Sequence, residues 1–154
     1  MQSKTNLPDA PRLDGGLRTL VGYNLKRASN AIQSQAARVL AQHDLRITTY
    51  SALCIICDQP DVTPAQLAAC LNMERSNTVL IIDALEQADL ITRNRAPHDG
   101  RSFVLRATLA GRQQRDSAAI ALARHETVAL AGVSASDIVH LCKLLKRIEA
   151  NCHD

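Results

Sequence analysis

Apolar residues recur at helical spacing along the first part of the chain and predict a long first helix. The stripe is formed by Leu13, Leu17, Leu20, Val21, Leu25, Ala28, Ile32, Ala36, Val39 and Leu40. This pattern predicts a helix of about 25 residues, which is long for a small domain. Such a helix cannot bury its stripe within a compact monomer unless something large covers it. Residues 1–12 contain two prolines and few apolar positions, so we expect a flexible arm there.

Further helices are predicted from capping residues that precede apolar runs. The expected spans are 48–58 after a cap at Thr48 or Thr49, 65–71 after Thr63-Pro64, and 74–88. Asn72, between the last two, adopts a left-handed backbone conformation at little cost. Two more helices are expected after Thr108 and Ser134, with Gly132 as the break between them.

Strand-forming residues are confined to one segment. Residues 90–93 and 102–106 flank a loop at 96–101, and together they predict a hairpin with its tip at Asp99-Gly100. The predicted order is therefore four helices, a hairpin and two helices, a mainly α fold in a single domain.

The amino-acid composition indicates which residue types form the core. The chain has 154 residues, of which 46% are apolar and only three are aromatic, so we expect an aliphatic, helical core. No apolar run approaches the ~20 residues that span a bilayer, and the first residues lack the apolar segment of a secretory signal. Five cysteines in such a chain are expected to be reduced thiols in the cytoplasm.

The net charge of +3 decides little, but the distribution of charge is informative. Between residues 90 and 115 there are six arginines and one acid, Asp99. A concentrated basic segment is typical of a protein that binds a polyanion, although a solvated surface can have the same composition.

Two short helices followed by a hairpin, over residues 63–106, predict a winged helix-turn-helix. In that motif the N-terminal residues of the second helix face base edges in the major groove of double-stranded DNA. The DNA-facing residues predicted on this helix are Arg75, Ser76, Asn77 and Thr78. Those predicted on the hairpin, or wing, are Arg93, Arg95, His98, Asp99 and Arg101.

The sequence over roughly residues 13–151 resembles the MarR family of bacterial transcription regulators. The motifs that carry the resemblance are Leu67-Ala68, Ser76, Asp83, Leu85-Glu86, Leu90, Arg93, Asp99-Gly100-Arg101 and Thr108-Leu-Ala-Gly111. Two positions depart from the family pattern, since Asp89 stands where glycine is usual and Ala107 where leucine is usual. Aspartate tolerates a left-handed conformation better than most residues, so we expect the turn at Asp89 to be kept.

The resemblance implies a homodimer in which the first helix and the last two helices of two chains interlock. Residues 13–44 and 109–154 would form the dimerisation region, and residues 45–108 the DNA-binding lobe. A two-fold dimer implies a pseudo-palindromic operator with half-sites about one helical turn apart. The resemblance also implies an ion pair between Asp99 and Arg101 that fixes the wing.

Regulators of this family usually respond to a small anionic, often aromatic, effector between helices 1, 2 and 5. The residues predicted to contact it are Arg18, Tyr23, Arg46 and Tyr50. Arginine would pair with a carboxylate, and tyrosine would stack or donate a hydrogen bond. The resulting hypothesis is a repressor that a small aromatic or phenolic acid releases from DNA. The competing interpretation is that Tyr50 belongs to the core and both arginines are solvated.

Two alternative functions remain open at the sequence level. The first is a thiol redox switch on the same fold, for which Cys54 and Cys57 form a C-x-x-C pair. The second is a helical module that binds protein instead of DNA. Since no catalytic constellation or phosphate-binding loop occurs, and the cysteines and histidines near the C-terminus lack close metal-ligand pairing, we expect no enzymatic activity, cofactor or metal.

Overall fold

The computed structural model describes residues 13–96 and 99–152. Within these residues the chain forms six α-helices and one antiparallel hairpin, which confirms the predicted mainly helical fold with a small wing. The elements are a 3₁₀ turn η1 (Leu17–Thr19), α1 (Val21–Ala41), α2 (Ile47–Asp58), α3 (Pro64–Leu71), α4 (Arg75–Gln87), β1 (Ile91–Ala96), β2 (Asp99–Ala107), α5 (Leu109–Ala129) and α6 (Ala135–Asn151).

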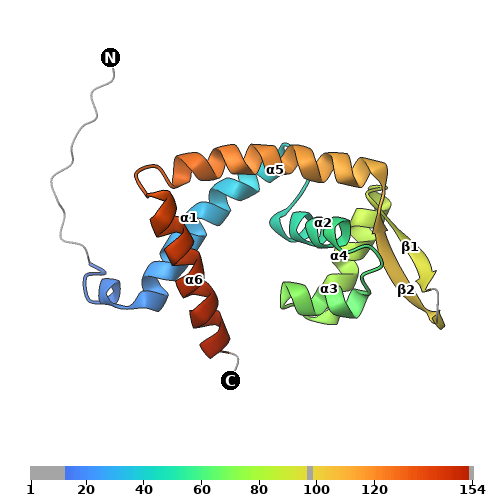
Figure 1. The fold of residues 1–154 in the computed structure, drawn as a ribbon, viewed down its shortest axis with the longest axis horizontal. Helices are drawn as coiled ribbons and strands as arrows, with labels where there is room; N and C mark the ends of the chain where they lie inside the picture. The colour runs from blue at the N-terminus through green and yellow to red at the C-terminus, as the bar shows by residue number, and fades with distance from the viewer. Residues whose placement is uncertain (1–12, 97–98, 153–154) are drawn as a thin grey trace, which may run out of the picture.

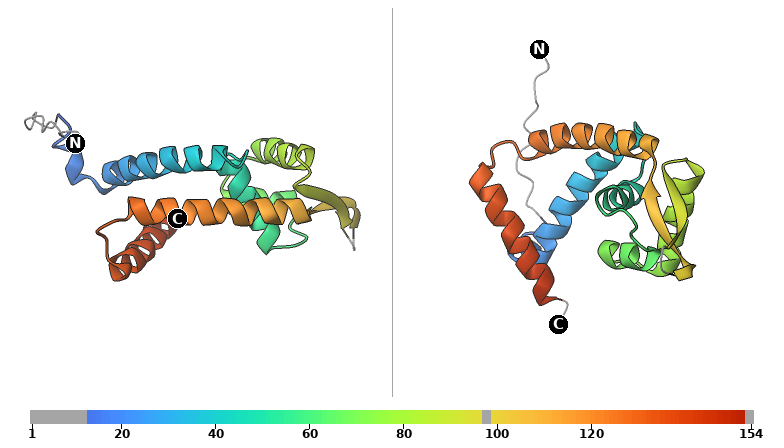
Figure 2. Two further views of the ribbon diagram at one scale, coloured as in Figure 1. Left: turned by 90° about the horizontal axis from the view of Figure 1, so that it is seen from above. Right: turned by 45° about the vertical axis from the view of Figure 1, so that its right-hand side comes forward.

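Helix α5 joins two groups of elements. In Figure 1, α2, α3, α4 and the hairpin gather at one end of α5, while α6 follows the other end and overlaps α1 in this view. The two further views in Figure 2 show the same separation. Polar contacts tie α1 and the turn after it to α5, since the Gln114 amide donates to the His43 carbonyl at 2.6 Å and His125 lies 2.6 Å from Gln35.

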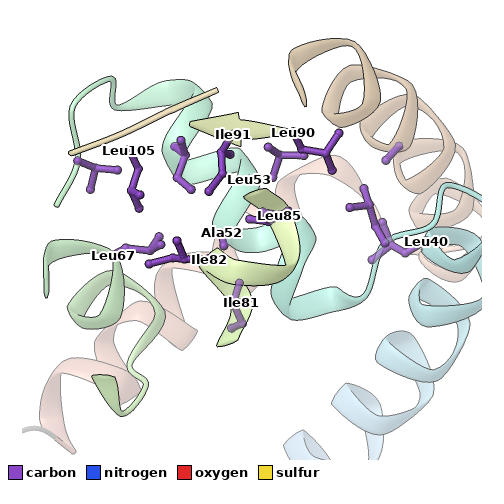
Figure 3. Packing of buried hydrophobic residues seen from close by; sticks show 14 residues of the cluster. Leu40, Ala52, Leu53, Leu67, Ile81, Ile82, Leu85, Leu90, Ile91 and Leu105 are labelled. Atoms are coloured by element: carbon purple, nitrogen blue, oxygen red, sulfur yellow. The ribbon is translucent and has the colours of Figure 1, made fainter. Parts of the chain in front are cut away.

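An aliphatic cluster forms the core of the lobe made by α2, α3, α4 and the hairpin. Ala52, Leu53 and Ile56 of α2 lie at its centre and are essentially inaccessible to solvent. Around them pack Leu67 of α3, Ile82 and Leu85 of α4, Ile91 of β1 and Leu105 of β2 (Figure 3). The composition predicted such an aliphatic core, and the two elements that carry DNA-facing candidates, α4 and the wing, are both anchored in it.

The hairpin is longer than the sequence predicted. Its register pairs Ile91 with Ala107 at the base and Ala96 with Asp99 at the far end, with an irregularity next to Arg95. The prediction that Asp99-Gly100 forms the tip is therefore wrong, because both residues lie in β2. Residues 97 and 98, which connect the strands, lie outside the described residues.

The first two helices begin at other residues than predicted. Helix α1 starts at Val21 instead of Leu13, because Leu20 is extended and the Asn24 side chain donates to the carbonyls of Arg18 and Leu20. Helix α2 starts at Ile47, so neither Thr48 nor Thr49 is its cap. The Thr49 hydroxyl instead bonds the backbone of Arg46, accepting from the N–H at 2.8 Å and donating to the carbonyl at 3.0 Å.

Helices α1 and α6 bury almost nothing within one chain. Leu40 is the buried residue of α1, and α6 has none. The two helices instead line an open groove of about 660 Å³ whose walls include Leu25, Ile32, Leu141, Leu144 and Ile148. Among the described residues, no helix is long and apolar enough to cross a membrane.

Candidate nucleic-acid interface

The turn between α3 and α4 fixes the start of the candidate recognition helix. Thr63 and Gln66 cap α3 reciprocally, with each side chain bonding the backbone N–H of the other residue. Asn72 caps the C-terminus of α3, and its φ of 50° is the left-handed conformation predicted from its residue type. The Met73 N–H then donates to the Ala68 carbonyl at 3.0 Å, which closes the turn directly before α4.

Three of the four DNA-facing residues predicted on α4 are exposed at its first turn. Arg75, Ser76 and Asn77 point away from the core, while Thr78 is only 1% exposed. The Thr78 hydroxyl donates to the Glu74 carbonyl at 3.1 Å. Thr78 therefore faces the lobe interior and not a groove of DNA, which corrects its inclusion in the predicted set.

The wing is held to α4 by an ion-pair cluster. The Arg93 guanidinium bonds the Asp83 carboxylate, and its other terminal nitrogen lies 2.9 Å from Glu86. Arg93, predicted from the sequence to contact DNA, is thus paired with two acids of α4 that the sequence pattern did not indicate as its partners. The family pattern includes Asp83, Glu86 and Arg93 at this spacing. Their contact holds β1 against α4 and thus explains the spacing.

A second ion pair fixes the other strand. Arg106 on β2 contacts Asp61 through two parallel bonds of 2.6 and 2.9 Å, and Val62 pairs with Leu105 as an isolated bridge. The hydrogen bond from Arg106 lowers the pKa of Asp61 below its usual value. These contacts fasten the wing to the turn between α2 and α3.

These pairings reduce the basic surplus that the sequence suggested. Arg93 and Arg106 are paired as described, and Arg115 contacts Asp58 at 2.8 Å and Asp116 at 2.6 Å. All of these acids lie outside residues 90–115, although Asp116 directly follows that segment, so a count within it could not include them. Arg95 is exposed and has no ion-pair partner among the described residues.

The far end of the wing carries three further predicted residues. The backbones of Asp99 and Arg101 belong to β2, but their side chains lie outside the described residues, as does the whole of His98. The Asp99–Arg101 pair and the DNA contacts at these positions therefore stay predictions.

The predicted effector residues form two separate groups. Arg18 and Tyr23 meet at Asp14, whose carboxylate accepts from the Arg18 Nε and from the Tyr23 hydroxyl, both at 2.8 Å. The Tyr23 hydrogen bond is the main reason that the pKa of Asp14 is lowered. The guanidiniums of Arg18 and Arg27 each lie 5.8 Å from the centre of the Tyr23 ring.

The second group lies beyond the other end of α1. Arg46 is exposed and lines a groove of about 330 Å³ between the start of α2 and helix α4. Tyr50 is half-buried on α2 beside Cys54, and burial raises its pKa to about 12. Since α1 is about 30 Å long, one small ligand within a single chain cannot contact both groups.

The C-x-x-C pair lies on α2, next to Tyr50. Burial is the largest cause of a raised pKa at both Cys54 and Cys57, and the Tyr50 hydrogen bond and the Arg115 charge only partly oppose it at Cys54. Both groups are therefore protonated thiols at neutral pH, whereas redox-sensing cysteines are exposed thiolates. All cysteines of the described chain are free, and no cluster of potential metal ligands occurs within it.

Alkylation at neutral pH is expected to separate these two thiols from the exposed ones. Cys70, Cys142 and Cys152 are exposed and should react with iodoacetamide first. Cys54 and Cys57 should react more slowly, because both are partly buried and burial disfavours the reactive thiolate. Mass spectrometry of peptides from a time course measures the order. Fast modification of Cys54 or Cys57 would restore the redox alternative.

Comparison with known proteins identifies the scaffold. Residues 45–103 match the MarR family model. A Thauera aromatica protein assigned as a transcriptional regulatory protein for the hcr operon is 28% identical over 140 residues, which cover 90% of this chain and 84% of the relative.

Solved structures also match over most of the chain. The transcriptional repressor CouR bound to a 23-mer DNA duplex is 30% identical, with a TM-score of 0.85, and the match covers 91% of this chain and 99% of that one. CouR from Rhodococcus jostii RHA1 bound to p-coumaroyl-CoA is 26% identical, with a TM-score of 0.79 and coverage of 86% and 93%. Together with the family model, these matches establish that the chain belongs to the MarR family and is a transcriptional regulator.

Proposed function

We propose that this regulator is a homodimeric repressor that binds a pseudo-palindromic operator and is released by a small aromatic or phenolic acid or its coenzyme A thioester. The observation that carries the proposal is the exposed first turn of α4, where Arg75, Ser76 and Asn77 stand beside a firmly anchored wing. Arginine can bond guanine in a bidentate manner and asparagine can bond adenine, so this turn can read base edges. The likeness to CouR bound to DNA supports the same use of the scaffold.

The groove between α1 and α6 supports the dimer. Its leucine and isoleucine walls are exposed in a single chain, with Leu25 at 40% and Leu144 at 42% exposure. Burial of such a surface by a second copy is favourable by about 25 cal/mol per Å² of apolar area. A two-fold dimer would place two α4 helices on two half-sites of the same operator. A protein that acts on the chromosome in this way works in the cytoplasm.

The proposed effector is supported by the CouR structure that contains p-coumaroyl-CoA. In this chain, Arg18 with Tyr23 and Arg46 with Tyr50 are the candidate contacts, and they stand at opposite ends of α1. A small aromatic acid can touch both groups only when a second copy supplies one of them. An effector that binds best when the two α4 helices are wrongly spaced for DNA would lower operator affinity by a population shift.

Reversal of charge at the start of α4 is expected to weaken binding to operator DNA by at least about 100-fold, because each half-site loses about 1–3 kcal/mol of contact and meets a new carboxylate. The variant is Arg75→Glu, and fluorescence anisotropy measures the affinity. Arg124→Glu makes the same charge change near the C-terminal end of α5, outside the helix-turn-helix and the wing, and should bind normally. Normal binding by Arg75→Glu would refute the assignment of the recognition helix.

A salt series and a ligand panel test the two halves of the proposal. Wild-type affinity should fall about 1,000-fold or more between about 50 and 200 mM salt, because phosphate contacts release counterions. Absent or salt-insensitive DNA binding would favour the protein-binding module.

The panel consists of p-coumarate, its coenzyme A thioester and coenzyme A alone, added to the protein–DNA complex. We expect release by an aromatic member and no release by coenzyme A.

A further inference from the structure

We propose that Val79 and Leu80 contact thymine methyl groups in the operator, so that α4 reads bases by apolar contact as well as by hydrogen bonds. This inference rests on the proposed DNA-binding function and adds the chemistry of the recognised base. Both residues are exposed on α4, and Leu80 also lies at the groove that Arg46 lines.

Val79 and Leu80 are exposed aliphatic residues on a helix whose other apolar residues are mostly buried. Val79 is 47% and Leu80 is 67% exposed. The core side of α4 is formed by Thr78, Ile81, Ile82 and Leu85, all of which are buried. Packing of the lobe therefore accounts for the neighbours of this pair and not for the pair itself.

Helix geometry places both residues on the surface that begins with the polar first turn. Val79 follows Arg75 by four residues, and Leu80 follows Ser76 by four residues. Side chains at this spacing are neighbours on a helix surface. When Arg75 and Ser76 face base edges, the next turn along the same groove presents Val79 and Leu80.

The charge of the following turn allows DNA to approach this far along α4. Asp83 lies one turn beyond Val79 and would repel phosphates if it were free. Its carboxylate is instead bonded by the Arg93 guanidinium, which also pairs with Glu86. The apolar pair is thus bordered by the cationic Arg75 on one side and by a compensated ion-pair cluster on the other.

The chemistry of the major groove selects the occupant. Thymine presents an apolar C5-methyl group there. The polar groups of the base edges are instead hydrogen-bond donors and acceptors. An aliphatic side chain against a donor or acceptor would remove water without replacing its hydrogen bond, which is unfavourable. A methyl group has no such bond to lose, so thymine is the base that fits Val79 and Leu80.

Removal of the methyl groups from the DNA tests the inference without changing any Watson–Crick hydrogen bond. A duplex selected by the wild-type protein from a random-sequence pool is prepared with thymine or with deoxyuridine at every thymine position. Each methyl group buried against the protein should change Kd about fourfold, so one contact in each of two half-sites gives about fifteenfold weaker binding to the deoxyuridine duplex.

Protein variants show whether the two residues cause this difference. Because uracil also alters base stacking, the measured quantity is the ratio of Kd values for the two duplexes. For the double variant Val79→Ala, Leu80→Ala this ratio should fall to about two or less. Leu109→Ala is the matched control, since Leu109 is 66% exposed but lies at the start of α5. It should keep the wild-type ratio.

The outcomes separate this inference from the proposed function. Equal wild-type affinity for the two duplexes, or an unchanged ratio in the double variant, overturns the methyl contact and leaves DNA binding intact. Failure to select any duplex overturns both. A double variant that melts normally but is monomeric in sedimentation would place the pair at a contact between copies and would also overturn the inference.

Discussion

Replacement of Leu144 by glutamate is expected to separate the proposed dimer into monomers and to weaken operator binding by at least about 100-fold. Leu144 lines the apolar groove between α1 and α6 and is 42% exposed in a single chain. A second copy seated in this groove would bury the new carboxylate without a partner, at a cost of several kcal/mol. A monomer reaches one half-site, so the contribution of the second α4 helix is lost. Sedimentation velocity and anisotropy measure the two effects.

The control for this variant is a glutamate elsewhere on the same helix. Ala150 is on α6 but outside the groove lining, so Ala150→Glu should remain dimeric and bind DNA normally. The isolated DNA-binding lobe has its own aliphatic core, so Leu144→Glu is expected to keep the helical content of the wild type. A dimeric Leu144→Glu protein would show that the copies meet through another surface.

Elements that depend on local signals could be predicted from the sequence. Helix α3 begins and ends as expected because its signals are local: the Thr63 side chain caps the start, Pro64 is the first helical residue, and Asn72 adopts a left-handed backbone conformation. The predicted start of α1 is wrong because the apolar stripe extends N-terminally of Leu20, to Leu13. Apolar periodicity does not reveal that the Asn24 side chain bonds two backbone carbonyls at the true start of the helix. The unusual exposure of this stripe was still correctly anticipated, since only a large covering surface can bury it.

The candidate site was predictable as a region but not residue by residue. The start of α4 follows from the motif, yet whether Thr78 faces DNA or the core depends on the phase of the helix against α2 and α3. Likewise, Arg93 and Arg106 looked like free cations because their acids, Asp83 and Asp61, come from other elements. Charge along the chain is therefore a weaker guide to the DNA-binding surface than the three-dimensional pairing of these arginines.

The junction between the wing and α5 depends on a glycine, and its replacement by alanine is expected to destabilise the protein by about 3 kcal/mol. A Cβ atom on Gly111 would lie 2.0 Å from the Leu90 carbonyl oxygen and 2.9 Å from its carbon. The same carbonyl accepts from the Thr108 N–H at 3.0 Å, and the Thr108 hydroxyl accepts from the Gly111 N–H at 2.9 Å. Alanine must therefore push α5 away from the turn after α4 or break these bonds.

The sign of the change makes this a strict test, because glycine-to-alanine substitution inside a helix ordinarily stabilises by about 1 kcal/mol. Gly22 is the matched control, since it lies in α1 and no atom of the chain lies within 4 Å of a Cβ added there. Thermal melting at equal protein concentration should lower the Tm by about 6–12 °C for Gly111→Ala and leave it unchanged or raised for Gly22→Ala. A stabilised Gly111→Ala protein would mean that α5 does not approach Leu90 this closely. The lobe and the dimerisation helices would then be joined more loosely than this contact requires.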